Sequence, residues 1–127
     1  MSYDWKEFIR FAHLINLPLA QNFLCFLGSF SKETLIRNGV SRTYYGVYCY
    51  SRNYANQKQG FVPSGQAKDH QKLRQHFIEN NQTEIADSLD RLREWRNQSD
   101  YDDILNDPNS IFQFAELESK TIFNQLR

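Results

Sequence analysis

The chain has 127 residues, of which 40% are hydrophobic and 24% are charged, so the composition excludes a disordered chain and predicts one globular domain spanning residues 1–127. Fifteen basic and fifteen acidic residues give a net charge of zero, so no overall field attracts the chain to nucleic acid or to an anionic membrane. Contact with RNA would therefore require a local basic patch, or a patch that oligomerisation assembles.

The aromatic content indicates how the chain builds its core, and the cysteine content indicates the redox state of its compartment. Ten Phe, seven Tyr and two Trp give an aromatic share of 15%, which suits both a core and a protein interface. Cys25 and Cys49 lie in apolar surroundings, so we expect two buried thiols in a reducing, cytoplasmic setting. No basic segment precedes an apolar run at the N-terminus, which argues against a signal peptide. The most apolar stretch, Leu17–Leu27, is too short to span a bilayer.

Two helices are expected before residue 30. Ser2 is the expected cap of the first helix. Its apolar residues at helical spacing are Trp5, Phe8, Ile9, Ala12 and Ile15. Pro18 ends or restarts the helix, and Leu19–Phe26 predicts a short, largely buried helix that ends at Gly28. His13 stands alone and is expected at or near the surface rather than as a ligand.

A second long helix is expected from Ser31, its N-cap, to about Gln57. Gly39 and Gly46 each cost about 1 kcal/mol in a helix interior. We therefore expect another helix to approach closely at both positions.

The next helix is expected to follow a Gly- and Pro-containing loop over residues 57–68, and to begin at Ala67 or Lys68. Its apolar residues are Leu73, Phe77 and Ile78. Its basic residues and histidines are Lys68, His70, Lys72, Arg74 and His76. His70 and His76 are six residues apart and do not share a helix face, so we expect no metal and no cofactor here. A solvated face is the simplest interpretation of Lys72.

Two further helices complete the expected bundle. Thr83 is predicted to cap a helix that ends near Ser99 or Tyr101, and an acidic loop leads to a last helix over Asn109–Leu126. Its core candidates are Ile111, Phe114, Ala115, Leu117, Ile122, Phe123 and Leu126. Amphipathic helices joined by short loops predict an all-α, up-and-down bundle of four or five helices.

The densest polar cluster lies at Leu92–Asp103, where an apolar stripe ends. The stripe consists of Ile85, Leu89, Leu92 and Trp95. Arg96, Asn97 and Asp100 project from the same helix end and, with Tyr101, form a candidate polar site, because a guanidinium offers a planar fork of donors to phosphate oxygens. The alternative is a surface ion pair at i,i+4, which contributes only about 0.2–0.5 kcal/mol.

Two segments resemble motifs of small bacterial HEPN-domain proteins. Residues 41–48 (SRTYYGVY) resemble the family's SRAYYAVF segment, and residues 92–102 (LREWRNQSDYD) resemble its LRxxRNxADYD segment. Asp4-Trp5 and His70 also stand where relatives often have them. The resemblance implies a HEPN-like bundle, a homodimer and, for many members, pairing with a minimal nucleotidyltransferase in a toxin–antitoxin system.

The resemblance also implies what catalysis would need. Active members are metal-independent ribonucleases with an Arg, usually an Asn, and a His four to six residues further on. The His acts as the base and the Arg offsets the developing phosphorane charge. Arg96 and Asn97 match the start of this motif, but no histidine follows Arg96. Tyr101 takes the place of the shortest-spaced His, although an unperturbed tyrosine pKa is about 10. Tyr101 is also the nearest match to a tyrosine that partners adenylylate in some pairs.

Three functions stay open at this stage. The first is a HEPN-like module that binds RNA, a nucleotide or a nucleotidyltransferase without cleaving RNA by the Arg/His route. The second is a ribonuclease in which His70 or His76 supplies the acid/base group. The third is an interaction protein that uses its aromatic residues as a contact surface. Arg42 and Tyr45 are expected either to join the Arg96–Tyr101 end in an interhelical network, with Arg42 paired to Asp100, or to line a ligand cleft with it.

Overall fold

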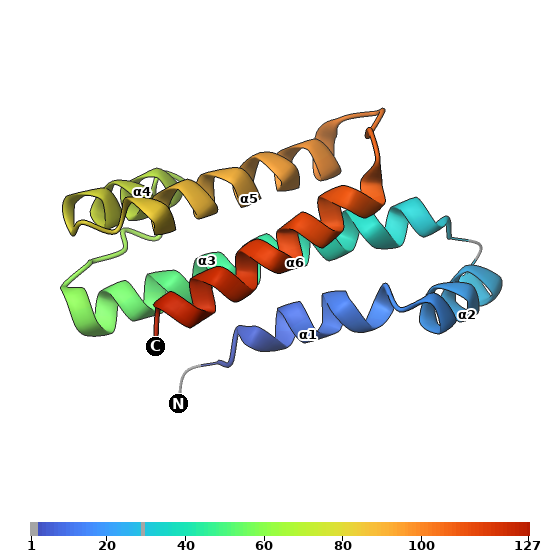
Figure 1. Ribbon diagram of the computed structural model, residues 1–127, viewed down its shortest axis with the longest axis horizontal. Coiled ribbons are helices and arrows are strands. Elements are labelled where there is room, and N and C mark those ends of the chain that lie inside the picture. Colours follow the sequence, from blue (N-terminus) through green and yellow to red (C-terminus); the bar gives the residue numbers. More distant parts are fainter. Residues whose placement is uncertain (1–2, 29) are drawn as a thin grey trace.

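The longest helix, α3 (Lys32–Gln59), forms the centre of the bundle and packs against α1 (Lys6–Ile15), α5 (Thr83–Tyr101) and α6 (Pro108–Gln125). The computed structural model describes residues 3–28 and 30–127 (Figure 1). Successive long helices run in opposite directions, and the shorter α2 (Pro18–Gly28) and α4 (Asp69–Glu79) lie at the two ends of the bundle. The all-α helical bundle is confirmed, with six helices in the described residues rather than four or five.

Local sequence signals explain both ends of α3. The Ser31 hydroxyl accepts the Thr34 N–H at 3.1 Å, which confirms the predicted N-cap of α3. Gly60 ends the same helix in the left-handed region, at φ 73°. The prediction that Thr83 caps α5 is wrong, because Thr83 is already the first helical residue and no side chain caps that end. The predicted cap Ser2 lies outside the described residues.

Both glycines of α3 admit a neighbouring element, as expected. A Cβ atom at Gly46 would lie 2.9 Å from the Trp5 carbonyl oxygen and 3.1 Å from the Ile9 side chain. A Cβ atom at Gly39 would lie 2.5 Å from the Asn16 amide nitrogen. The absence of a side chain therefore lets α1 pack directly on the backbone of α3.

The main core contains the predicted apolar stripe of α5. Ile85, Leu89 and Leu92 are buried, and Trp95 packs at the edge. Within α4, Leu73 and Phe77 are fully buried, whereas Ile78 is exposed. The large fully buried apolar side chains are Tyr44, Phe77, Leu73, Ile85, Leu92, Ile122, Leu126, Val40 and Val47.

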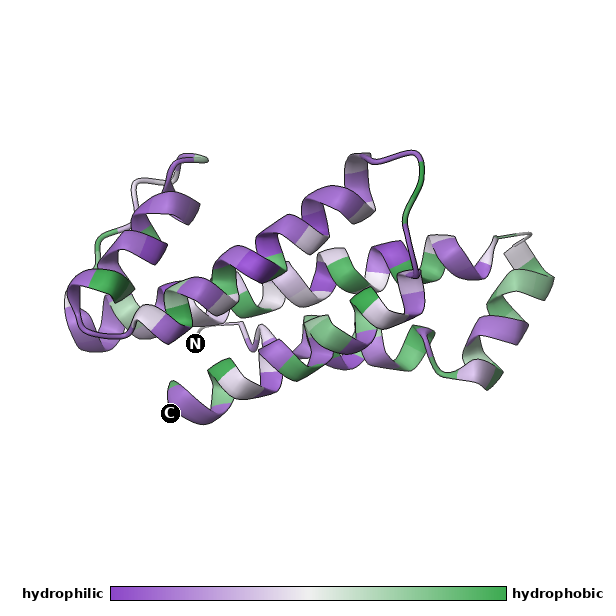
Figure 2. Cartoon of the chain, turned by 45° about the horizontal axis from the view of Figure 1, so that its top comes forward, coloured by the Kyte–Doolittle hydropathy of each residue, from purple (hydrophilic) through white to green (hydrophobic). Residues whose placement is uncertain are grey.

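Three burial predictions are wrong. The α2 helix was expected to be largely buried, but none of its residues is buried. Figure 2 shows that this helix, at one end of the bundle, carries many hydrophobic residues. Cys25, on α2, is only half-buried, whereas Cys49 is buried as expected, and both thiols are free. Phe114 and Leu117 of α6 are exposed, although the Phe114 ring stacks on Trp95 at 6.1 Å between centroids. Apolar surroundings (for α2 and Cys25) and helical position (for Phe114 and Leu117) predicted burial on faces that the chain does not cover.

Among the described residues no single helix is long and apolar enough to cross a membrane. Taken together, α1 and α2 pass that test by length and composition alone, but the pair is bent by 76° at the break between the two helices.

Candidate functional site

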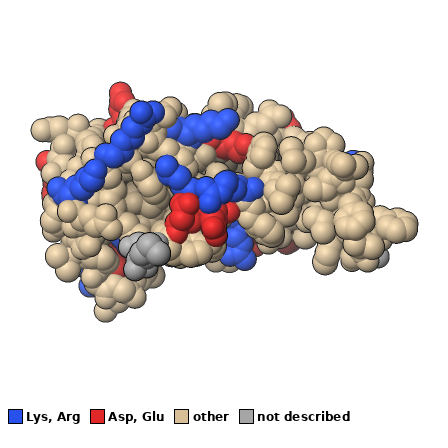
Figure 3. All heavy atoms as spheres, turned by 90° about the horizontal axis from the view of Figure 1, so that it is seen from below, with Lys and Arg blue, Asp and Glu red and all other residues tan. Residues whose placement is uncertain are grey.

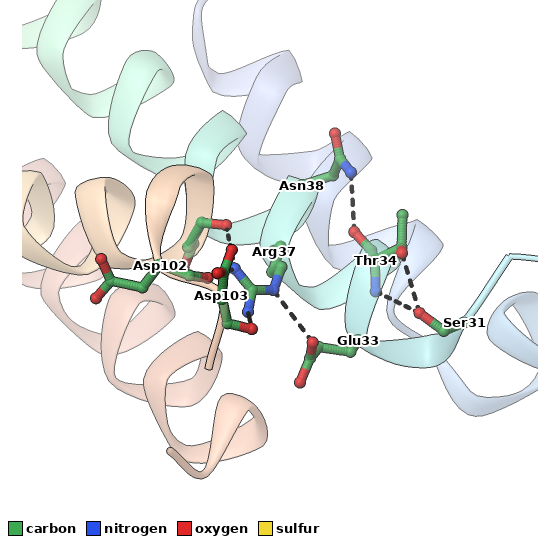
Figure 4. A network of polar contacts seen from close by, with 8 residues as sticks. Ser31, Glu33, Thr34, Arg37, Asn38, Asp102 and Asp103 are labelled. Atoms are coloured by element: carbon green, nitrogen blue, oxygen red, sulfur yellow. Dashed lines mark hydrogen bonds and ion pairs between the residues drawn. The ribbon is translucent and has the colours of Figure 1, made fainter. Parts of the chain in front are cut away.

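The C-terminal end of α5 is fixed to α3 by one arginine. Arg37 donates from Nη1 to the carbonyl oxygens of Ser99 at 2.9 Å and Asp102 at 2.7 Å, and from Nη2 to that of Asp103 at 3.3 Å (Figure 4). Glu33 holds the Arg37 side chain from the previous turn, with an Nε to Oε2 distance of 3.3 Å. Carbonyls at a helix C-terminus lack intrahelical partners, and a cation there also offsets the helix dipole. Arg37 thus sets the position of the helix end that carries Arg96.

Arg96 joins α5 to α3 through Tyr45. Its Nη2 donates to the Tyr45 hydroxyl at 2.7 Å, and its Nη1 donates to the Asn97 side-chain oxygen at 3.2 Å. Its Nε lies 2.9 Å from Asp100 Oδ2, but the N–H is not aligned with that oxygen, so this contact is an ion pair without a hydrogen bond. The guanidinium carbon lies 5.0 Å from the Tyr45 ring centroid and 5.6 Å from that of Tyr101. The cation therefore lies close to two tyrosine rings.

The expected interhelical network exists, but Arg42 takes no part in it. The Arg42 guanidinium lies over the Phe8 ring at 5.6 Å, on the α1 side of α3, instead of pairing with Asp100. Its neighbour Ser41 makes the link, donating from Oγ to Asp100 Oδ2 at 3.3 Å. Consecutive helix positions point about 100° apart, so one residue along the chain decides which helix is contacted.

His70 lies in a stack of rings beside this network. Its imidazole is parallel to the Tyr48 ring at 3.8 Å between centroids, and it meets the edge of the Tyr45 ring at 6.3 Å. Its Nδ1 shares a short hydrogen bond with the Tyr44 hydroxyl. Because the Tyr45 ring touches both His70 and the Arg96 guanidinium, it connects the ring stack to the end of α5.

The buried carboxylate of Asp69 helps to place His70. It accepts the Ser64 N–H at 3.0 Å, the Ser64 hydroxyl at 2.5 Å and the Gly65 N–H at 2.8 Å. These bonds hold the loop between α3 and α4 to the first turn of α4. His70 follows directly and faces α3.

His76 does not join the site. Its Nε2 lies 3.0 Å from Gln59 Oε1, and its ring meets the edge of the Phe61 ring at 5.3 Å. These contacts place it against the C-terminal end of α3. His70 and His76 therefore have separate partners.

Positive charge surrounds the imidazole of His70. Burial lowers its pKa below the usual 6.5, the Arg96, Arg74 and Arg52 guanidinium groups lower it further, and Asp69 opposes them. His70 is consequently neutral at neutral pH. Burial also raises the pKa of the Tyr44 hydroxyl well above its usual range, so Tyr44 stays protonated.

Two arginines of this region share one carboxylate. Arg93 Nη2 lies 3.0 Å from Asp90 Oδ1, and Arg74 Nε lies 3.7 Å from the same atom. Both side chains are partly exposed, so donors remain for a ligand. The region thus combines guanidinium groups with aromatic rings.

The structure unites most of the predicted site residues and adds others. One contact network contains Arg96, Asn97, Asp100, Tyr101 and Tyr45. Tyr45 connects this network to His70, and the charge of Arg74 acts on His70. Arg42 and His76 lie outside the network.

Residues missed by sequence reasoning are Arg37, Arg52, Arg93, Tyr44 and Tyr48. Tyr44 and Tyr48 are one helical turn apart, a spacing that marks a shared face. No sequence signal connects Arg37 to carbonyls more than sixty residues away.

This arrangement can bind an anion and stack a planar ring. Guanidinium groups donate to phosphate oxygens, and the Tyr101 ring, 71% exposed, offers a free face beside Arg96. Comparison of the chain with models of protein families, with curated proteins and with solved structures gives no significant match.

Proposed function

We propose that this chain is a HEPN-like helical domain that binds RNA, or a nucleotide, through phosphate contacts and base stacking, and that it does not cleave RNA by the Arg/His route. One observation carries the proposal. In a chain of zero net charge, Arg74 and Arg93 share the single carboxylate of Asp90, at 3.7 and 3.0 Å, so two guanidinium groups face one carboxylate in this region. A local excess of positive charge is what a neutral protein needs to attract a phosphate backbone.

The aromatic residues extend this argument from phosphate to nucleotide. Tyr101 is exposed and borders the Arg96 guanidinium, and a base stacked on an aromatic ring contributes about 1–3 kcal/mol. Single-stranded RNA offers unstacked bases together with a charged backbone. We therefore favour a single-stranded or looped RNA over a regular duplex.

Cleavage by the motif that the resemblance implies is disfavoured by the same geometry. No imidazole follows Arg96 in the chain, and the Tyr45 ring lies against both the Arg96 guanidinium and His70. Asp100, 2.9 Å from Arg96 Nε, adds a negative charge where a phosphate would approach. Arg96 therefore serves first as an interhelical link, and Arg74 and Arg93 are better placed to meet phosphate.

The test is RNA binding by the whole chain, measured by fluorescence anisotropy with a labelled single-stranded RNA. Arg74→Gln or Arg93→Gln should weaken binding about tenfold and reduce the salt slope by about one, as for one lost phosphate contact. Arg91→Gln is the matched control, because Arg91 lies on the same helix as Arg93 but pairs with Glu118 of α6 at 2.8 Å. It should leave affinity unchanged.

Two results would contradict the proposal. Absence of RNA and nucleotide binding at about 50 mM salt, where phosphate contacts are strongest, would favour an interaction protein without a nucleic-acid ligand. Specific RNA cleavage in the presence of EDTA that is lost in Arg96→Ala would show that the Arg/His-like route operates.

A ribonuclease that uses His70 is the second candidate, and the lowered pKa of His70 favours it. A neutral imidazole can accept a proton from a ribose 2′-hydroxyl, and Tyr44 already engages Nδ1, which leaves Nε2 for that role. This candidate predicts cleavage that His70→Gln abolishes and His76→Gln leaves intact. Cleavage equally sensitive to both substitutions would argue against it.

The resemblance also proposes a context for the domain. Pairing with a minimal nucleotidyltransferase in a cytoplasmic toxin–antitoxin system predicts an open reading frame for such an enzyme beside this one. Co-expression of the two chains should then yield a complex that survives purification, and the absence of such a neighbour would remove this part of the proposal.

A further inference from the structure

Arg52 of α3 lies beside the ring stack and forms no ion pair with any carboxylate among the described residues. Its Nε and Nη2 both donate to the side-chain oxygen of Asn53, at 3.2 Å each, and Asn53 carries no charge. A guanidinium has more N–H donors than these two bonds use, and the Arg52 side chain is partly exposed. Its charge and its remaining donors are therefore available to an anion.

The other guanidinium groups near the ring stack are already offset by carboxylates. Arg96 Nε lies 2.9 Å from Asp100 Oδ2. Arg93 and Arg74 lie 3.0 Å and 3.7 Å from the same oxygen of Asp90. A phosphate that approaches any of these three groups also meets a negative charge, which opposes its binding. An anionic ligand therefore gains most from the unpaired guanidinium of α3.

The Arg52 guanidinium is part of the ring stack. Its carbon lies 5.8 Å from the centroid of the Tyr48 ring, and Tyr48 stacks on His70 at 3.8 Å between centroids. Burial raises the pKa of the Tyr48 hydroxyl and Asp69 raises it further, whereas Arg52 lowers it. The Asp69 oxygens accept hydrogen bonds from the loop between α3 and α4. Asp69 is therefore held by that loop and leaves Arg52 without an ion-pair partner.

Arg52 and Arg96 lie at opposite ends of a row of rings. The row runs from Tyr48 through His70 to Tyr45, whose ring centroid lies 5.0 Å from the Arg96 guanidinium carbon. Tyr45 and Arg52 are seven positions apart on α3, which is about 10 Å along the helix axis at a rise of 1.5 Å per residue. One phosphate group is too small to contact both ends. A ligand that does so carries negative charge at more than one position.

We propose that Arg52 is a further phosphate-binding residue of the candidate site, and that the ligand is a single-stranded oligonucleotide rather than a mononucleotide. This inference rests on the RNA-binding function proposed above and adds the end of the site at which the backbone is held. Tyr101 offers a stacking face at the Arg96 end, whereas Tyr48 is 7% exposed and cannot stack on a base. Arg52 thus contacts the backbone and does not read the sequence.

Arg42 provides a matched control on the same helix. It too has no ion-pair partner within residues 3–28 and 30–127, and its guanidinium lies over an aromatic ring, that of Phe8, at 5.6 Å. It faces α1 rather than the ring stack. Figure 3 shows the molecule from the α1 side, where basic and acidic side chains adjoin at the centre of the face, and Arg10 of α1 pairs with Asp4 at 3.1 Å. The two control positions therefore differ in location, not in chemistry.

The test is fluorescence anisotropy of the whole chain with labelled oligo(A) and oligo(U), over a series of salt concentrations. Arg52→Gln should weaken binding of both by at least about tenfold and reduce the salt slope by about one, as for one lost phosphate contact. The loss should exceed that in Arg74→Gln, because Asp90 already offsets Arg74. Arg42→Gln should bind like the wild type. Arg52→Lys keeps the charge without the planar fork, so it should fall between the wild type and Arg52→Gln.

Competition tests the length of the ligand. Unlabelled AMP should displace the oligonucleotide only at a far higher concentration than unlabelled oligo(A), counted per nucleotide, because AMP reaches one end of the site. Equal potency per nucleotide would overturn the inference. So would an Arg52→Gln variant that binds like Arg42→Gln, or a loss confined to one of the two sequences, which would assign Arg52 to a base.

These outcomes leave the RNA-binding function standing, whereas absence of RNA binding by the wild type would remove that function and this inference with it. Both Gln variants lose a guanidinium from an aromatic ring, so both should keep the helical circular dichroism of the wild type. Arg52→Lys gives a second reading should Arg52→Gln lose helical structure.

Discussion

Replacement of Arg37 by Met tests how the end of α5 is held. The substitution keeps a long side chain but removes three hydrogen bonds to the carbonyl oxygens of Ser99, Asp102 and Asp103. A hydrogen bond to a charged group contributes about 1.5–3 kcal/mol when it is shielded from water. The Arg37 side chain is 18% exposed, whereas Asp102 and Asp103 are exposed and their carbonyls regain water in the variant. We therefore expect a loss of about 2–3 kcal/mol rather than the sum of three shielded bonds.

The measurement is urea unfolding followed by tryptophan fluorescence. The midpoint should fall while the slope m stays constant, as expected for a change in native-state stability. Asn38→Ala, one residue along α3, removes only an exposed bond to the Thr34 carbonyl and should change the unfolding free energy by less than about 0.5 kcal/mol. Arg37→Lys keeps the charge but loses the planar fork, so it should fall between wild type and Arg37→Met. If Arg37→Met is as stable as Asn38→Ala, the cap does not hold the helix end and the reasoning fails.

Two further predictions concern the packing of α3 and the titration of the ring stack. Gly46→Ala should lower the free energy of unfolding by about 1 kcal/mol, because overpacking against the Trp5 carbonyl outweighs the gain in helix propensity. Urea unfolding measures the change, and Gln57→Ala, at an exposed position of the same helix, is the control. A stabilised Gly46→Ala variant would contradict the close approach of α1 to α3. His70 has a lowered pKa in the folded chain, so the unfolded chain binds more protons below about pH 6.5 and stability should fall as the pH drops through that value. His70→Asn should show a shallower fall between about pH 7.5 and pH 5.5 in unfolding titrations, and an unchanged profile would show that His70 is not the group responsible.

The candidate site could be predicted in part. Arg96, Asn97, Asp100 and Tyr101 are close in sequence on one helix end, so their proximity follows from helical geometry alone. The sequence could not predict that Ser41, rather than its neighbour Arg42, contacts Asp100, because this contact depends on the rotation of α3 relative to α5. The stack of His70 on Tyr48 depends on how the loop anchored by Asp69 turns α4 back onto α3.

The sequence by itself determined the all-α class, the positions of most helices, the N-cap at Ser31 and the need for close packing at Gly39 and Gly46. Each of these depends on spacing or on the chemistry of one residue, which act over a few positions of the chain. Only the tertiary structure decided which apolar faces are covered. The exposure of α2, of Phe114 and of Leu117 depends on which helices remain to pack on them, and periodicity does not contain that information.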